Sequence, residues 1–465
     1  MAEKIEFENR MSEADALLWH VEQDPLLRST ILTVWVMDHA PPHEELHDRI
    51  ELAARMLPRM RQRVATSSFS VAPPRWEEDP DFDLEYHVRW LRAPGGGTMR
   101  ALLDLAQPMA MQSFDKARPL WEMAVVEGLE DGRAGIILKL HHALSDGVGL
   151  VRMTTTLIDH ERKQLTLDDV PPPPPGPTMS MAERILDALG HQQRRQLDIT
   201  RRTWNAISEG IGNATRHPVE ATRDVTDAIA SVGRLLKPHS EPSSPLMTKR
   251  SLRLHLDSFV IDLEDLKRSS RAAGGKLNDA FLAAISGGFR LYHEAHGAAV
   301  ESLHASMPVN LRNEATENVA GNQFVPVRFP VPIAEADPLS RMKEIRARVE
   351  GQLGEAALPW FGDISALLTR FPTAVLTAAL GTMLKGVDFV ASNVPGPPVR
   401  VSICGAEITE CFGFGPLGGA AVNVTLFSYD GQLRIAITTD RAAVPDSDFF
   451  LECLHRGFQE VLTTP

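Results

Sequence analysis

The sequence predicts a mixed α/β (α+β) fold made of two halves, each with its own sheet and helices. The chain has 465 residues, which is more than one ordinary domain holds. Strand-like and helix-like periodicities are mixed in both halves, and a run of prolines at 171–175 separates them. We therefore expect an N-terminal domain over residues 1–170, an interdomain connection over 171–250 and a C-terminal domain over 251–465, with a cleft between the two domains.

The first half begins with a helix signal, because Ser12-Glu13-Ala14-Asp15 resembles a capping box and favours a helix through about Glu22. Periodicity then predicts, in order, a strand over 31–37, a helix over 43–56, a strand over 82–88, a helix over 102–107, and strands over 123–128 and 134–142. Asp131-Gly132 lies between the last two strands and is typical of a hairpin turn.

The connection and the second half follow the same patterns. We expect two polar helices in the connection, over 181–207 and 224–236. The second half is expected to contain a strand over 251–259, a helix over 277–296, strands over 325–329 and 389–392, and a hairpin of strands 421–429 and 433–439 turning at Asp430-Gly431.

An apolar segment, Phe371–Leu384, carries no charge. It is shorter than the roughly 20 residues that are needed to cross a bilayer. We interpret it as a core helix, with a helix lying on a lipid surface as the alternative.

The composition is that of a globular protein, with 43% hydrophobic and 23% charged residues. A net charge of -13 argues against a broad nucleic-acid surface, although it leaves room for a small basic pocket that binds phosphate. The N-terminus lacks the apolar core of a signal peptide, and the three cysteines form no CxxC pair. We therefore expect packing roles for the cysteines and a reducing cytoplasm as the location.

The most informative segment is His141-His142-Ala143-Leu144-Ser145-Asp146-Gly147, which follows an apolar run. Because side chains alternate along a strand, His141 and His142 are expected on opposite faces. One of them can then reach a cleft while the other packs or hydrogen-bonds within its own domain. Asp146 follows a short turn in which Gly147 allows a tight backbone, and we expect its carboxylate to fix the loop by pairing with an arginine.

Other catalytic motifs are missing or incomplete. No serine has the Gly-x-Ser-x-Gly surroundings of a nucleophile elbow, and Gly274-Gly275-Lys276 lacks the upstream glycine of a P-loop. Residues 413–418 match the dinucleotide pattern only formally, because a strand-like segment follows them. His43-Glu44-Glu45-Leu46-His47 matches a zinc motif without a third ligand nearby, so we prefer a solvated helix face. General acid–base catalysis by one histidine remains.

The His-His-x-x-x-Asp-Gly pattern resembles the signature of the CoA-dependent acyltransferase superfamily, which includes chloramphenicol acetyltransferases and condensation domains. Further segments resemble the bacterial wax ester synthase/diacylglycerol acyltransferase family, in the right order along nearly the whole chain. These segments are 11–16, 82–89, 114–122, 277–280, 308–312, 321–322 and 392–397. The resemblance implies two chloramphenicol-acetyltransferase-like domains with mixed sheets and a tunnel between them, in which acyl-CoA meets a lipid alcohol.

The resemblance also implies roles for single residues. His142 would be the general base that takes the proton from the acceptor hydroxyl, with no covalent acyl-enzyme. His141, Asp146 and Gly147 would hold the loop and the ring orientation. Contacts to the substrates are expected from Pro119, Leu120, Trp121, Asn278, Asp279 and Arg312.

Several of these residues have alternative roles. Asn278 either supplies an oxyanion donor or caps the following helix. Pro119-Leu120-Trp121 either shapes the acyl channel or packs in the core. Arg312 pairs with Asp146, binds a CoA phosphate or lies on the surface, and Arg118 is equally open.

The expected products are triacylglycerol, wax esters or both. Acyl-CoA is a substrate in such a reaction, so neither a cofactor nor a metal is implied. We expect a cytoplasmic protein with peripheral contact to the inner membrane face or to lipid droplets. Two alternatives are an acyltransferase fed by a carrier protein and a non-catalytic protein of lipid surfaces. The segment after Pro25 lacks the Met-His start common in relatives, which bears on the choice of acceptor.

Overall fold

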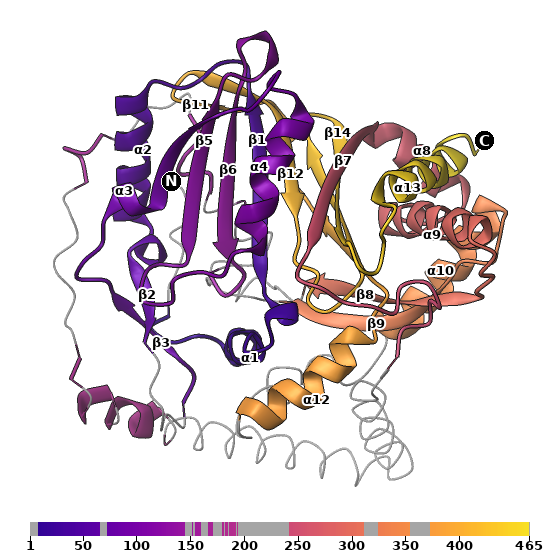
Figure 1. The fold of residues 1–465 in the computed structure, drawn as a ribbon, viewed down its shortest axis with the longest axis horizontal. Helices are drawn as coiled ribbons and strands as arrows, with labels where there is room; N and C mark the ends of the chain where they lie inside the picture. The colour runs from indigo at the N-terminus through magenta and orange to yellow at the C-terminus, as the bar shows by residue number, and fades with distance from the viewer. Residues whose placement is uncertain are drawn as a thin grey trace, which may run out of the picture.

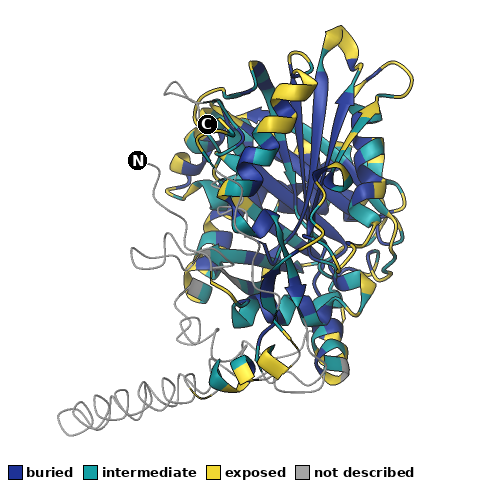
Figure 2. Cartoon of the chain, turned by 90° about the vertical axis from the view of Figure 1, so that its left-hand side faces the viewer, coloured by how far each residue is buried: buried dark blue, intermediate teal, exposed yellow. Residues whose placement is uncertain are grey.

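The computed structural model places two six-stranded sheets side by side, with helices packed around them (Figure 1). It describes residues 8–65, 72–144, 151, 154–159, 166–170, 179–180, 182–184, 186–191, 193, 241–310, 324–353 and 373–464. Buried residues concentrate in the strands, and exposed residues lie on the outer helices and turns (Figure 2).

The first sheet is mixed and has the strand order β11-β12-β1-β6-β5-β4. Its strands are β1 (Thr30–Met37), β4 (Val88–Arg92), β5 (Trp121–Glu127), β6 (Ala134–His141), β11 (Ser402–Ile403) and β12 (Ala406–Phe414). Neighbouring strands are antiparallel except β4 and β5, which are parallel. A separate ribbon pairs β2 (Gln62–Ala65) with β3 (Arg75–Glu78).

The second sheet is also mixed and has the order β7-β14-β13-β10-β8-β9. Its strands are β7 (Leu254–Asp262), β8 (Ser302–Asn310), β9 (Phe324–Pro332), β10 (Phe389–Val394), β13 (Val422–Tyr429) and β14 (Gln432–Asp440). Strand β10 runs parallel to both of its neighbours, β8 and β13, and the other pairs are antiparallel.

Most helices pack on the outer sides of the two sheets, whereas one helix, α4 (Met99–Met111), packs between the first sheet and β7 (Figure 1). The first half also has α1 (Glu13–Val21), α2 (His43–Met56) and α3 (Leu84–His87). The second half has α8 (Leu263–Ala272), α9 (Leu277–Ala295), α10 (Pro338–Leu353), α12 (Thr373–Lys385) and α13 (Ser447–Leu462). Short 3-10 turns are η1 (Pro25–Leu27), η2 (Pro58–Met60) and η3 (Glu130–Gly132).

Helix α9 is held tightly because its glycines let α13 approach at backbone distance. A Cβ atom at Gly457 would lie 2.3 Å from the backbone nitrogen of Gly288, so only glycine fits at this crossing. The first turn of α9 carries Asn278 and Asp279, two of the predicted site residues. The tight packing therefore fixes the position of that turn.

The two halves share a sheet and a core. Strand β12 comes from the second half but pairs with β1 over Leu32–Met37. One apolar cluster joins Leu102 of α4 to Leu256 of β7 and Phe412 of β12. The expectation that each half has its own sheet therefore misses the crossing of β11 and β12 into the first sheet, whereas the domain boundaries themselves stay a prediction.

Most of the predicted elements are confirmed to within a few residues, and the predicted helix 43–56 has the bounds of α2. Both predicted hairpin turns are present: Asp131 and Gly132 have φ values of 60° and 75°, and Asp430 and Gly431 have 48° and 71°. The predicted helix 102–107 is part of the longer α4, which begins after the Thr98 cap.

The predicted strand over 82–88 is wrong. Asp83 accepts a hydrogen bond from the Glu85 N–H at 3.1 Å and caps the single helical turn α3. The strand β4 begins only at Val88. One helical turn is too short for its period to be told from the alternation of a strand.

The apolar segment Phe371–Leu384 forms most of α12, a surface helix that packs against α1. Leu376 is buried on this helix, whereas Val375 is 55% exposed. None of the helices in the described residues has the length and apolar character that a membrane span needs. The proline run and the predicted helix 224–236 lie outside the described residues, and residues 182–184, 186–191 and 193 of the predicted helix 181–207 are described, all as helix.

Candidate active site

The two adjacent histidines lie where β6 ends and the chain turns. His141 is the last residue of β6 and is 1% exposed, and its backbone N–H donates to the Leu120 carbonyl at 3.0 Å. His142 is partly buried, and its N–H donates to the Ser29 carbonyl at 2.8 Å. His142 lines a cavity whereas His141 points into the packed interior, so the predicted division between the two is confirmed.

A buried carboxylate, Glu22, holds His141. The Nε2 atom of His141 lies 2.9 Å from Oε1 of Glu22, whose side chain is 7% exposed. The Nδ1 atom of His141 accepts a hydrogen bond from the Ala143 N–H at 3.0 Å. Because Nδ1 is an acceptor, the ring proton lies on Nε2 and faces Glu22.

The same Glu22 oxygen also holds the strand that faces the histidines. Oε1 accepts a hydrogen bond from the Ser29 N–H at 2.5 Å, and the Ser29 carbonyl in turn receives the His142 N–H. Burial raises the pKa of Glu22, but hydrogen bonds from His141 and Ser29 and the charge of Lys116 outweigh it and lower the pKa. Glu22 is therefore an anion at neutral pH, and it fixes both ends of the histidine turn.

Sequence reasoning missed Glu22. It was expected only as the end of the first helix, and it is the C-cap of α1. Its distance from His141 along the chain gives no local pattern, so the sequence alone offered no signal for the pair.

Aromatic side chains enclose His141. The Trp19 ring meets it edge-on at 5.4 Å between centroids, and the Phe114 ring does so at 5.9 Å. The ammonium groups of Lys116 and Lys139 lie 4.1 Å from the centroids of Trp19 and Phe114, respectively. The segment 114–122 thus supplies part of the shell around His141.

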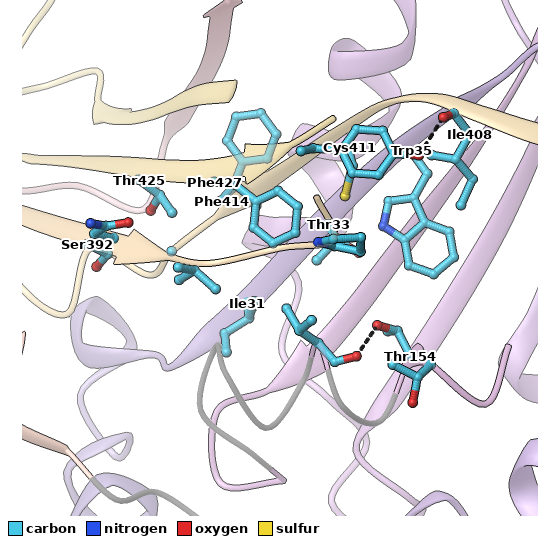
Figure 3. Close-up of a pocket in the computed structure, with 18 of the residues that line it drawn as sticks. Ile31, Thr33, Trp35, Thr154, Ser392, Ile408, Cys411, Phe414, Thr425 and Phe427 are labelled. Atoms are coloured by element: carbon cyan, nitrogen blue, oxygen red, sulfur yellow. Dashed lines mark hydrogen bonds between the residues drawn. The ribbon is translucent and has the colours of Figure 1, made fainter. Parts of the chain in front are cut away.

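His142 lines a cavity with a volume of about 180 Å³. The cavity lies between strands of the two sheets (Figure 3). Its walls come from β1 and β12 of the first sheet, from β10 and β13 of the second, and from Val151, Thr154, Thr155 and Ile158. Among the described residues that line it there is no Asp, Glu, Lys or Arg. Such a cavity suits an apolar group, and His142 brings acid–base chemistry to it.

Leu120 and Trp121 are buried in the core at the start of β5. The Trp121 Nε1–H donates to the Met60 carbonyl at 2.8 Å, and the ring stacks on His87 at 4.5 Å. Trp121 borders a smaller void of about 20 Å³, which shares Thr154 with the main cavity. Pro119 is also buried. The structure thus places the Pro-Leu-Trp segment beside the main cavity and not in its wall.

Asn278 and Asp279 lie in the first turn of α9 but act differently. The N-cap is Lys276, whose N–H donates to the Asp279 carboxylate at 2.7 Å. Asn278 is therefore not the cap. Its Oδ1 accepts a hydrogen bond from Nδ2 of Asn393 at 2.6 Å, and Asn393 lines the cavity. Asn278 is one hydrogen bond away from the cavity wall.

Three predicted site residues, Asp146, Gly147 and Arg312, lie outside the described residues, so their roles stay predictions. The guanidinium of Arg118 packs 4.2 Å from the centroid of the Tyr86 ring. Arg118 also lies 3.7 Å from the carboxylate of Asp115.

The zinc-like motif at 43–47 does not converge on one point. The His43 ring stacks on Trp90 at 3.3 Å, and the His47 ring lies 3.4 Å from Glu85. In the part of the chain that the structure describes, one group of three potential ligands is close enough to hold a metal: His255, Asp257 and Asp448. Arginines already bind two of these residues, Arg441 at His255 and Arg100 at Asp257, which disfavours a cation there.

Family models match most of the chain. The model described as "Wax ester synthase/diacylglycerol acyltransferase catalytic domain" matches residues 11–281. The model described as "WS/DGAT C-terminal domain" matches residues 320–461. A protein of Mycobacterium tuberculosis, named as a candidate diacylglycerol O-acyltransferase, is 36% identical over 457 residues, which cover 98% of this chain and 92% of that protein.

Solved structures agree on the fold. The wax ester synthase/diacylglycerol acyltransferase from Marinobacter aquaeolei VT8 superimposes with a TM-score of 0.64 at 19% identity, covering 98% of each chain. The starter condensation domain of rhizomide synthetase gives a TM-score of 0.58 at 14% identity, covering 97% of this chain and 93% of that one. The predicted mixed α/β fold with two sheets is therefore confirmed. The chain belongs to the wax ester synthase/diacylglycerol acyltransferase family of acyl-CoA-using acyltransferases, which is related in fold to condensation domains.

Proposed function

We propose that this protein transfers an acyl group from acyl-CoA to the hydroxyl of diacylglycerol, of a long-chain alcohol, or of both. The observation that carries the proposal is the position of His142, which opens on an uncharged cavity between the two sheets while its neighbour His141 is turned away and held by Glu22. Membership of the family supplies the reaction class.

In the proposed reaction the His142 imidazole takes the proton from the acceptor hydroxyl as the oxygen attacks the thioester carbonyl. A tetrahedral oxyanion forms and collapses, the carbon–sulfur bond breaks, and CoA leaves as a thiolate. The imidazolium of His142 is then the proton donor for that thiolate. Because a thiolate leaves readily, no acyl-enzyme is required. An imidazole suits both steps because it gains and loses a proton near neutral pH.

His141 and Asn278 support this reaction in different ways. His141 is a positioning residue, since its contact with Glu22 fixes the turn that carries His142. Asn278 is the proposed oxyanion donor: its Oδ1 accepts from Asn393, which leaves its amide NH₂ as the donor group. Asp146 and Gly147 would complete the loop.

The test uses purified protein, labelled palmitoyl-CoA, and diacylglycerol or a long-chain alcohol offered separately. We expect ester formation that is lost in His142→Ala and kept in His43→Ala, a control because the exposed His43 lies on α2. Both variants should remain folded, with a small loss of stability in His43→Ala because its ring stacks on Trp90. Full activity of His142→Ala would refute the mechanism. No ester with either alcohol would favour the carrier-fed acyltransferase or the non-catalytic lipid-surface protein.

Peripheral contact with a membrane or a lipid droplet belongs to the same proposal. Both proposed acceptors are lipids that dissolve in a bilayer rather than in water. Helix α12 supports this because it is a surface helix that exposes the apolar side chain of Val375.

A further inference from the structure

The cavity follows strand β1 away from the catalytic turn. In the register between β1 and β6, Thr30 lies opposite His141, so His142 sits at the beginning of β1. Ile31, Thr33 and Trp35 share one face of β1, and all three line the cavity (Figure 3). The cavity therefore begins at His142 and reaches Trp35 along this row.

Strand β12 forms the neighbouring wall of the cavity, with its residues in register with those of β1. Gly413 lies opposite Thr33 and Cys411 opposite Trp35, and directly opposed residues of antiparallel strands point to the same face. A Cβ atom built on Gly413 would have no atom within 4 Å, so the space beside this glycine is open. The missing side chain of Gly413 keeps the middle of the cavity clear.

Buried side chains fill the far end of the cavity. Trp35 is 4% exposed, and Ile408 and Tyr429 are 2% exposed. The Tyr429 hydroxyl donates to the Ile408 carbonyl at 2.7 Å and accepts from the Val401 N–H at 3.0 Å. These contacts leave the indole of Trp35 at a closed end.

Hydrogen bonds of Asp159 hold residues 154–159 over the Trp35 end of the cavity. The Asp159 carboxylate accepts hydrogen bonds from the N–H groups of Cys404 at 3.1 Å and Gly405 at 2.8 Å. The Asp159 N–H donates to the Ser402 carbonyl at 2.7 Å, and the carboxylate lies 3.0 Å from Arg49. These contacts of Asp159 attach residues 154–159 to the turn between β11 and β12, so this segment covers the cavity beside Trp35.

We propose that this cavity receives the fatty acyl chain of acyl-CoA and that Trp35 sets how much of the chain it holds. The inference rests on the proposed function. Ile31 and Trp35 are four positions apart on β1, a distance of about 13 Å at a rise of about 3.3 Å per residue. An extended alkyl chain advances about 1.25 Å per carbon, as its bond lengths and angles require, so about ten carbons fit.

The acyl chain is a better occupant than the other parts of the substrates. CoA is polyanionic, and the described wall offers it no cationic side chain. Diacylglycerol has two chains, whereas a single row of β1 side chains defines the length of the cavity. A single unbranched chain attached to a thioester at His142 matches its shape and its polarity.

The test measures the affinity for acyl-CoA from butanoyl to octadecanoyl by calorimetry and, in parallel, kcat/KM with diacylglycerol. Each buried methylene should improve binding about fourfold until the cavity is full. In the wild type we expect the improvement to stop at about ten carbons. Trp35→Ala opens the space up to Met37, two residues further, and should raise the chain length at which the improvement ends by about five carbons. Trp35→Leu, a milder change, should move it in the same direction.

Gly413→Val provides the opposite test, because its side chain would fill the middle of the cavity. We expect the improvement to stop at about five carbons, since Thr33 lies about half-way along the row. Val36→Ala is the matched control, because Val36 is buried on the other face of β1. This variant should leave the limiting chain length unchanged.

The inference is overturned if the chain length at which binding ceases to improve is unchanged in both Trp35→Leu and Gly413→Val. It is also overturned if the variants change the preferred length of the alcohol and not that of the acyl-CoA. Binding that shows the predicted stops without any ester formation would support the cavity assignment and refute the proposed function, so the two failures are distinguishable.

Discussion

Replacing Glu22 should weaken the fold and the catalytic turn together. In Glu22→Ala, the Ser29 N–H loses its hydrogen-bond acceptor and the His141 Nε2 atom loses its carboxylate contact at 2.9 Å. Each buried donor without a partner costs about 2 kcal/mol, so the free energy of unfolding should fall by about 4 kcal/mol. Because Ala143 already donates to Nδ1 of His141, the ring cannot adapt by moving its proton.

Glu22→Gln is the informative partner variant. Both contacts reach the same oxygen, Oε1, so a glutamine amide oxygen can keep the contacts to Ser29 and His141. Only the charge is lost, which costs about 1 kcal/mol per bond, or about 2 kcal/mol in all. We expect kcat/KM to fall about 100-fold in the alanine variant, through displacement of His142, and by less in the glutamine variant.

The assay combines urea denaturation with kcat/KM for ester formation from palmitoyl-CoA. Glu44→Ala is the control, because Glu44 is exposed on α2, and its stability should change by less than about 0.5 kcal/mol. Glu22→Ala that is as stable and as active as this control would refute the reasoning. A destabilised Glu22→Ala with full activity per folded molecule would refute the positioning role alone.

Two further predictions concern pH and lipid. The pKa of Glu22 is lowered from its ordinary value of 4.5, so the difference in unfolding free energy between the wild type and Glu22→Gln should be constant above pH 4.5 and shrink as the pH falls through the lowered pKa. Denaturation at a series of pH values measures this difference. A difference that is the same at every pH would contradict the prediction. If α12 meets the lipid surface, Val375→Asp should reduce flotation with vesicles containing diacylglycerol, and equal flotation of the variant and the wild type would remove α12 from that contact.

Local patterns were enough to place the histidines. The alternation of β6 puts His141 and His142 on opposite sides, and the structure confirms that one is packed and the other lines a cavity. The same kind of pattern failed at residues 82–88, because the cap at Asp83 turns an alternating segment into one helical turn. Hydrophobic periodicity alone is enough to assign a long helix or strand, but it cannot assign a short one.

Contacts between distant segments were not predictable from the sequence. Glu22 reaches His141 only because α1 and β6 pack together, and neither residue carries a local sign of the other. The crossing of β12 into the first sheet is likewise set by its pairing with β1 and by no pattern of its own. The sequence left Asn278 open between a helix cap and an oxyanion donor; in the structure Asp279 makes the hydrogen bond at the helix start, and Asn278 bonds to Asn393.

The crossing of β12 also determines how the cavity can select a chain length. Trp35 and Gly413 lie on β1 and β12, which are paired neighbours in one sheet at the fixed spacing that backbone hydrogen bonds impose. The facing wall, which includes Ser392 and Thr425, belongs to the second sheet. A shift of one sheet against the other changes the width of the cavity but leaves the distance along β1 unaltered. A length limit set by Trp35 is therefore a property of a single sheet.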